Sequence, residues 1–280
     1  MTSRPLNISQ ALSTLSSRPW IIAHRGDWRS LPENSPAAIL SAFDLGADMV
    51  EIDVQSIADG TLIVIHDDQL DRTTNASGQV EDLTAADLSD IRLKAGDGGD
   101  ANPETDLALP RLAEVLEAVR GKGLLNLDTK HRRDLDATCA LVLSMNMQDQ
   151  VLMKMIVRED DDGSDFVPRP WFGQVAFMPV ILDTPKGDLC KRVTQIARTT
   201  NAPIVEILFE DEGELCQLAK ELETMNVGIW TNTLDPVPPL EFSDAQALKD
   251  PQAVWGKLLD LGVRAFQTDR PEELRMFWGR

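Results

Sequence analysis

The residues best suited to chemistry are two carboxylates and a histidine in the segment EIDVQSIADGTLIVIHD, residues 51–67. Glu51 and Asp53 lie two positions apart in an apolar stretch, so in an extended strand their side chains point the same way. The link that follows is too short to cross over to a parallel strand, so residues 62–66 are predicted to return antiparallel and to place His66 beside Asp53. Two carboxylates and an imidazole at a strand end favour a site for a hard divalent cation with a proton-transfer group beside it.

Apolar strands alternating with helices must position these residues. Apart from the returning strand, eight strands are predicted to begin near Trp20, Asp48, Leu124, Val151, Gln174, Pro203, Val227 and Arg264. The first helix between them is predicted to have Ser35 as N-cap, to carry Pro36 at its first position and to end at Gly46. Eight strands alternating with helices predict an α/β fold of the (β/α)8 TIM-barrel class. An open doubly wound sheet is the alternative, and it fits this strand count less well.

We expect one domain over residues 1–280, since a barrel of about 250 residues would use the whole core. Residues 55–109 interrupt the alternation and are predicted to form a small insertion after the second strand. It contains a predicted helix at residues 83–91 and a Gly- and Asp-rich surface loop at residues 94–106, which lacks the ligand spacing of a calcium loop. Residues 1–19 are predicted to form a short amphipathic helix against one end of the barrel, or a partly disordered arm.

The charge of the chain argues against some classes of partner. With 46 acidic and 27 basic residues, the formal net charge of −19 repels phosphate backbones and anionic membranes, so neither nucleic acid nor stable membrane association is expected. No apolar run approaches the roughly 18 residues of a membrane span, and the N-terminus has no signal-peptide pattern. Three cysteines (Cys139, Cys190 and Cys216) without metal-ligand spacing suit a reducing compartment. We therefore expect a cytoplasmic protein, with monomer and homodimer both open.

Polar residues gather where the predicted strands end, which is where the active sites of (β/α)8 barrels lie. These residues are His24 and Arg25 on the first strand, Glu51 and Asp53 on the second, Asp128 and Lys130 on the third, Trp230 and Asn232 on the seventh, and Asp269 on the eighth. The carboxylates of Glu51, Asp53 and Asp128 form an oxygen-rich cradle that suits Mg²⁺ or Ca²⁺ better than Zn²⁺, which favours histidine or cysteine. A metal there would polarise a phosphoryl oxygen.

The basic and imidazole side chains near this cradle suit phosphate chemistry. Arg25 and Lys130 are predicted to neutralise charge that develops on phosphorus. His24 and His66 flank the predicted metal site and can divide the roles of base and acid, because imidazole titrates near neutral pH. His131 directly follows Lys130, and we interpret it as a loop residue at the rim and not as a catalyst.

Several motifs of the chain resemble those of glycerophosphodiester phosphodiesterases, a family of phosphatidylinositol-phospholipase-C-like barrel phosphodiesterases. The motifs are HRG, PENS, GADMVEIDV, DGTLIVIHD, LDRTT, LNLDTK, IWTN and GVRAFQTDRP, and they span residues 21–271. The resemblance implies a (β/α)8 barrel with a small insertion after the second strand. It also implies dependence on a divalent cation, Mg²⁺ or Ca²⁺ with Mn²⁺ as a further candidate. The implied reaction is hydrolysis of a small-molecule glycerophosphodiester to glycerol 3-phosphate and an alcohol.

Position by position, the resemblance implies a role for each of seven matching residues. It implies that Glu51 and Asp53 are metal ligands, His24 and His66 the acid-base pair, Arg25 and Lys130 phosphate contacts, and Trp230 a wall for the glycerol carbons.

Two positions depart from the family. Asp128 stands where the family usually has glutamate, so its carboxylate is one methylene shorter, and Lys154 stands where a small polar residue is more common. Aspartate followed two residues later by lysine resembles sphingomyelinase D and phospholipase D-like barrels, which act on lysophospholipids. That activity therefore stays open as an alternative, as does a barrel that binds phosphodiesters without turnover.

Lys154 and Glu206 are charged residues in the otherwise apolar fourth and sixth strands. A charge cannot rest between barrel and helices without a partner. We therefore predict that both side chains point into the barrel near its mouth, within reach of each other, and that Lys154 adds positive charge toward a bound phosphate.

Overall fold

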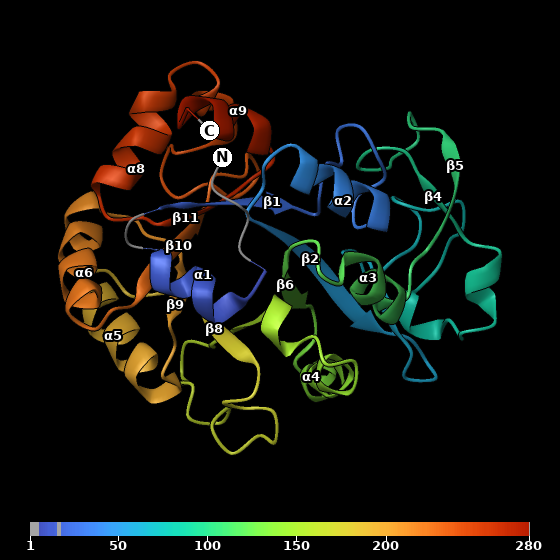
Figure 1. Ribbon diagram of the computed structural model, residues 1–280, viewed down its shortest axis with the longest axis horizontal. Coiled ribbons are helices and arrows are strands. Elements are labelled where there is room, and N and C mark those ends of the chain that lie inside the picture. The colour runs from blue at the N-terminus through green and yellow to red at the C-terminus, as the bar shows by residue number, and fades with distance from the viewer. Residues whose placement is uncertain (1–5, 16–17, 280) are drawn as a thin grey trace.

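The computed structural model describes residues 6–15 and 18–279, and eight parallel strands in this part of the chain close into a barrel (Figure 1). Around the ring the strands follow the order β1-β2-β6-β7-β8-β9-β10-β11, and β11 pairs with β1. They are β1 (Trp20–His24), β2 (Met49–Ser56), β6 (Leu124–Thr129), β7 (Val151–Ile156), β8 (Ala176–Ile181), β9 (Ile204–Ile207), β10 (Gly228–Asn232) and β11 (Ala265–Thr268). The predicted (β/α)8 barrel is confirmed.

Helices on the outside of the ring follow the strands, as the alternation of elements predicts. They are α2 (Pro36–Asp44), α3 (Leu112–Val119), α4 (Leu135–Ser144), α5 (Leu189–Thr200), α6 (Glu212–Thr224), α7 (Asp244–Ala247), α8 (Lys257–Asp260) and α9 (Pro271–Phe277). The side chain of Ser35 caps α2 by accepting a hydrogen bond from the Ala38 amide, and Gly46 follows α2 with a φ of 102°. No described helix is long and apolar enough to span a bilayer.

The N-terminal end of the barrel is closed by α1 (Ile8–Thr14), which lies across the ring of strands in Figure 1. Ile8, Ala11 and Leu15 pack with inward side chains from the strands into a buried apolar cluster, and Leu12 lies against its edge. The predicted helix is therefore present, although the side chain of Leu6 is exposed. Residues 1–5 and 16–17, which belong to the same prediction, lie outside the described residues.

The inside of the barrel changes from apolar to polar along the strands. The apolar cluster next to α1 contains Ile22, Met49, Leu124, Leu152 and Ile204, one from each of five strands. Two residues further along the same strands come His24, Glu51, Asn126, Lys154 and Glu206. Because side chains two positions apart share a face of a strand, these polar residues also point inward, one layer nearer the C-terminal mouth. The mouth of the barrel is thus polar above an apolar floor.

The segment between β2 and α3 leaves the barrel and carries its own small sheet. β3 (Leu62–Val64) pairs antiparallel with the end of β2, as predicted, and β4 (Arg92–Lys94) pairs antiparallel with β5 (Glu104–Ala108). A separate apolar cluster that includes Leu70, Val80, Leu88 and Leu93 holds this segment together.

The helix predicted at residues 83–91 is wrong, since only Asp87–Ser89 form a 3₁₀ turn there. The backbone N–H and the hydroxyl of Thr84 both donate to the carboxylate of Asp87. Such local bonds from short polar side chains compete with helix formation.

Candidate active site

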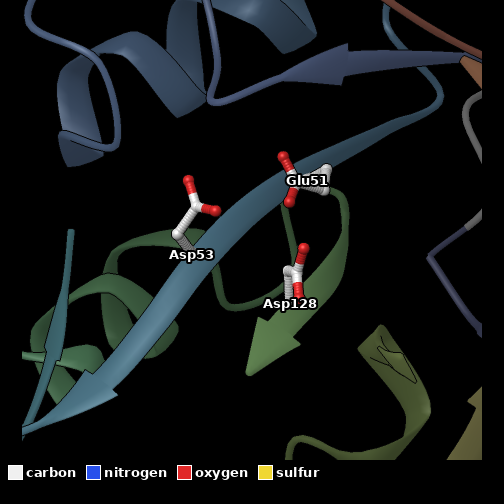
Figure 2. A group of neighbouring side chains, drawn as sticks. All are labelled: Glu51, Asp53 and Asp128. Atoms are coloured by element: carbon white, nitrogen blue, oxygen red, sulfur yellow. The ribbon is translucent and has the colours of Figure 1, made fainter. Parts of the chain in front are cut away.

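Three carboxylates meet at the mouth of the barrel, on the adjacent strands β2 and β6 (Figure 2). Glu51 and Asp53 stand on β2, and the parallel register places Asp128 of β6 directly beside Asp53. One oxygen atom from each of the three lies within 4.8 Å of the others. Asp128 therefore joins the cluster in spite of its shorter side chain. Its side chain is 29% exposed, whereas Glu51 and Asp53 are buried, so the cluster opens to solvent on the Asp128 side.

The two buried carboxylates differ in their electrostatic surroundings. Burial raises the pKa of Glu51 to about 7, although the Lys154 ammonium 3.6 Å away opposes the rise. Burial would likewise raise the pKa of Asp53, but the charges of Arg25 and Lys130 outweigh it and hold that pKa below its usual range. Arg25 Nε lies 3.1 Å and Lys130 Nζ 3.6 Å from the Asp53 carboxylate. Asp53 is thus an ionised carboxylate at neutral pH.

The donor set of this cluster fits a hard divalent cation. All three groups are carboxylates, the ligands that Mg²⁺ and Ca²⁺ prefer. Glu51 Oε2 is buried and has no hydrogen-bond partner among the residues that the structure describes. A buried oxygen without a donor costs free energy, and a cation bound beside it would remove that cost.

His24 is held at the mouth by a carboxylate from the other end of the chain. Its Nδ1 lies 2.9 Å from Asp269 Oδ1, which also accepts a 2.8 Å hydrogen bond from Trp28 Nε1. The Asp269 backbone N–H in turn donates to the buried carboxylate of Asp244, at 2.7 Å. The sequence placed Asp269 at a strand end but did not pair it with His24.

His66 is held by a second carboxylate, that of its neighbour Asp67. Its Nδ1 lies 2.6 Å from Asp67 Oδ1, and Arg72 Nε lies 2.6 Å from Asp67 Oδ2. Arg72 also donates to both carboxylate oxygens of Glu33, at 2.9 and 3.0 Å, and so ties the insertion to the loop after β1. Its bonds lower the pKa of Asp67 to about 2. The sequence analysis did not identify Arg72 as a site residue. Its position in the LDRTT motif is the feature that could have indicated it.

The predicted neighbourhood of His66 and Asp53 is confirmed. The backbone N–H of Ile65 donates to the Asp53 carbonyl oxygen at 3.0 Å, which brings the return strand alongside β2. The charge of His66 is also one of the causes that lower the pKa of Asp53. The third histidine, His131, lies 3.2 Å from the exposed carboxylate of Asp68.

Lys154 and Glu206 both point into the barrel, as predicted. Lys154 Nζ lies 3.3 Å from Glu206 Oε2 and 3.4 Å from Asp128 Oδ2, and these charges raise the pKa of Lys154 against the opposing effect of burial. Lys154 is therefore a buried cation beneath the carboxylate cluster. With 4% of its surface exposed, it is too deep to serve as a direct phosphate ligand in this conformation.

We predict that Lys154→Met lowers the free energy of unfolding by about 3–5 kcal/mol, because it leaves the buried Glu206 carboxylate without its cation. Adding Glu206→Gln should recover part of the loss. Urea unfolding measures both variants, and Lys257→Met, which breaks an exposed pair with Glu212, is the matched control with an expected change within about 1 kcal/mol. Equal losses for Lys154→Met and the control would contradict the prediction.

Trp230 is the predicted site residue that the structure does not bring to the mouth. Its side chain is fully buried in the apolar cluster beside α1, and its Nε1 donates to Gln267 Oε1 at 3.2 Å. A side chain with no exposed surface cannot line an open substrate pocket in this conformation, so we leave Trp230 out of the proposed site. Gln267 Oε1 also lies 3.5 Å from Lys154 Nζ, so Gln267 connects Trp230 to the buried Lys154 ammonium.

The fold and the site define a (β/α)8 barrel with a metal-type carboxylate cluster between two carboxylate-bound histidines. The model of the glycerophosphoryl diester phosphodiesterase family matches residues 24–273, and the chain belongs to that family. The glycerophosphodiester phosphodiesterase of Caldanaerobacter subterraneus subsp. tengcongensis is 43% identical over 115 residues. The match covers 39% of this chain and 44% of that protein, so it spans less than half the length of the curated relative.

Two solved structures share the fold over nearly the whole chain. The glycerophosphodiester phosphodiesterase from Agrobacterium tumefaciens has a TM-score of 0.69 and 25% identity, with 92% of this chain and 99% of that chain covered. A phosphodiesterase from Oleispira antarctica, solved with the product sn-glycerol-3-phosphate, also has a TM-score of 0.69, with 23% identity and coverage of 95% and 98%. At that identity the second likeness shows the fold alone.

Proposed function

We propose that this protein hydrolyses glycerophosphodiesters to glycerol 3-phosphate and an alcohol with the help of a divalent cation. The observation that carries the proposal is the cluster of Glu51, Asp53 and Asp128 within 4.8 Å, with His24 and His66 each held by a carboxylate nearby. Family membership supports the substrate class.

We assign the cation to Glu51, Asp53 and Asp128, with Mg²⁺ or Ca²⁺ as the first candidates and Mn²⁺ as the third. When bound, such a cation supplies Lewis acidity toward a phosphoryl oxygen. Lys154 lies beneath Glu51 and Asp128 and balances part of their negative charge. Three carboxylates and the further carboxylate of Glu206 can then share one buried site.

Arg25 and Lys130 are the proposed contacts for the phosphate. Both are partly exposed and both lie beside the Asp53 carboxylate, at 3.1 and 3.6 Å. Their charges therefore face the place where a phosphodiester would bind next to the carboxylate cluster. Positive groups fixed in advance at that place stabilise the charge that develops on the phosphoryl oxygens.

The two histidines are the proposed acid and base. Each has Nδ1 on a carboxylate, His24 on Asp269 and His66 on Asp67, which leaves Nε2 as the nitrogen that exchanges a proton with the substrate. A carboxylate behind an imidazole fixes its orientation and stabilises the protonated ring. One histidine can thus take the proton of the attacking group, a glycerol hydroxyl or water, while the other gives a proton to the leaving alcohol.

Assays of glycerophosphocholine, glycerophosphoethanolamine, glycerophosphoinositol and lysophospholipids with Mg²⁺, Ca²⁺ or Mn²⁺ test the proposal. We expect release of glycerol 3-phosphate from the diesters, and loss of that activity when EDTA removes the cation. Turnover confined to lysophospholipids would favour the phospholipase D-like alternative. Binding of the diesters without turnover would favour a non-catalytic barrel.

We further propose that residues 1–280 act as a single barrel domain with residues 55–109 as its insertion. The separate apolar cluster of that segment supports this division. The cytoplasmic location and the choice between monomer and homodimer stay predictions.

A further inference from the structure

The mouth of the barrel has two sides of different chemistry. The three clustered carboxylates and His24 occupy β1, β2 and β6, and His66 follows β3, whereas apolar residues continue the inward faces of β7 and β9. Leu208 comes two residues after Glu206, and the backbone N–H of Leu208 still bonds to the Ile181 carbonyl oxygen of β8. Leu208 therefore continues the inward face of β9 one layer above Glu206. By the same alternation Ile156 lies above Lys154, and its side chain is 48% exposed.

A cavity of about 810 Å³ opens on this apolar side, between the loops that follow β8, β9 and β10. Leu182, Leu208 and Leu240 are among its lining residues, so it begins where the inward face above Glu206 ends. Its volume lies in the range of roughly 300–1,000 Å³ that is usual for small-molecule sites. A substrate that spans both sides of the mouth would reach from the carboxylate cluster into this cavity.

The polar part of the lining is mostly acidic. Glu159, Asp183, Glu210 and Glu214 line the cavity, against one basic residue, Lys186, among the described residues that form its wall. Glu214 accepts a hydrogen bond from the Gly187 N–H. In the described part of the chain, none of the other three carboxylates forms a salt bridge. The cavity therefore combines apolar walls with an excess of negative charge, since four acidic residues and one basic residue line it.

We infer that this cavity holds the leaving alcohol of the substrate and selects alcohols that carry an organic cation, such as the trimethylammonium group of choline. The inference rests on the proposed function, because that function places a phosphodiester at the carboxylate cluster, which lies at the same end of the barrel as the cavity. The methyl groups of such a cation pack against leucine side chains, while its charge faces the carboxylates of Glu159, Asp183 and Glu210. A neutral polyol of similar size makes neither contact as well.

The test compares glycerophosphocholine with glycerophosphoglycerol, whose leaving alcohol is neutral. The triple variant Glu159→Gln, Asp183→Asn, Glu210→Gln removes the charges and keeps the side-chain sizes. Because each exposed pair changes kcat/KM by about 2- to 5-fold, we expect the wild-type preference for the choline ester to be roughly tenfold or more. We expect the triple variant to lose most of this preference because its kcat/KM for glycerophosphocholine falls. Its kcat/KM for glycerophosphoglycerol should stay within about twofold of wild type.

The matched control makes the same change in net charge at the other end of the barrel, with Asp149→Asn, Glu223→Gln and Asp260→Asn, which line cavities near α1. It should keep the wild-type preference. A wild-type protein that prefers the neutral diester, or a triple variant that changes kcat/KM for both diesters equally, would overturn the inference.

Saturation-transfer NMR with choline alone separates this inference from the proposed function. If the wild type cleaves neither diester but binds choline, and the triple variant does not bind choline, the cavity is still a site for organic cations and the proposed function fails. If the wild type cleaves both diesters at the same rate and shows no choline binding, the proposed function stands and the cavity assignment fails.

Discussion

Glu51→Gln and Asp53→Asn are each expected to abolish turnover and to weaken divalent-cation binding beyond detection at millimolar metal. Each change removes one charged ligand from a site that has three carboxylates, and a hard cation gains most of its affinity from such charges. Isothermal titration with Mg²⁺, Ca²⁺ and Mn²⁺ measures binding, and release of glycerol 3-phosphate measures turnover. EDTA should reproduce the loss of turnover in the wild type, and an excess of metal should reverse it.

The two variants should differ in the stability of the metal-free protein. Burial raises the pKa of the Glu51 carboxyl group, because burying its charged form is unfavourable. Burying the neutral amide of Gln costs less free energy, so Glu51→Gln should unfold at or above the wild-type temperature. Asp53 pairs with Arg25 and Lys130, so Asp53→Asn should unfold at a lower temperature. Asp106→Asn, an exposed change in the insertion, is the control for lost charge. Full turnover of either site variant, or of the wild type in excess chelator, would refute the metal assignment.

His24→Ala and His66→Ala are each expected to lower kcat by roughly 10² to 10⁴, because each proton transfer contributes about that much. Both side chains stand at the mouth and are partly exposed, so the fold should survive each change. His131→Ala is the matched control: it removes an imidazole that pairs with the exposed Asp68, and its kcat should stay at the wild-type value. A loss in the control as large as in the site variants would show that the effect is not specific to His24 and His66.

The products formed by the two histidine variants distinguish two courses of the reaction. If the glycerol hydroxyl of the substrate attacks phosphorus first, the variant that lacks the acid or base for the second step should accumulate a cyclic phosphate. Both courses place one oxygen of ¹⁸O-labelled water in glycerol 3-phosphate, so direct attack by water is recognised by single-turnover hydrolysis that yields no cyclic product at any time. Mass spectrometry of the products detects both the cyclic phosphate and the labelled glycerol 3-phosphate.

Much of the site follows from local properties of the chain. The spacing of Glu51 and Asp53 determines that they share a face of a strand, because successive side chains alternate. The short link after β2 determines that the next strand returns antiparallel, which brings His66 to Asp53. The cost of burying an unpaired charge between barrel and helices determines that Lys154 and Glu206 each point inward. None of these inferences needs the position of any distant residue.

Other parts of the site depend on closure of the barrel. Trp230 is an inward residue by the same alternation, yet it belongs to the apolar floor, because its level is set by the register of β10 against its neighbours. Asp269 reaches His24 across 245 positions of sequence, and Arg72 reaches Glu33 across 39. Side-chain direction in a strand is a local property with a period of two residues, so the sequence alone determines it. Register and ion pairing between distant residues depend on every strand of the closed ring, so only the tertiary structure decides them.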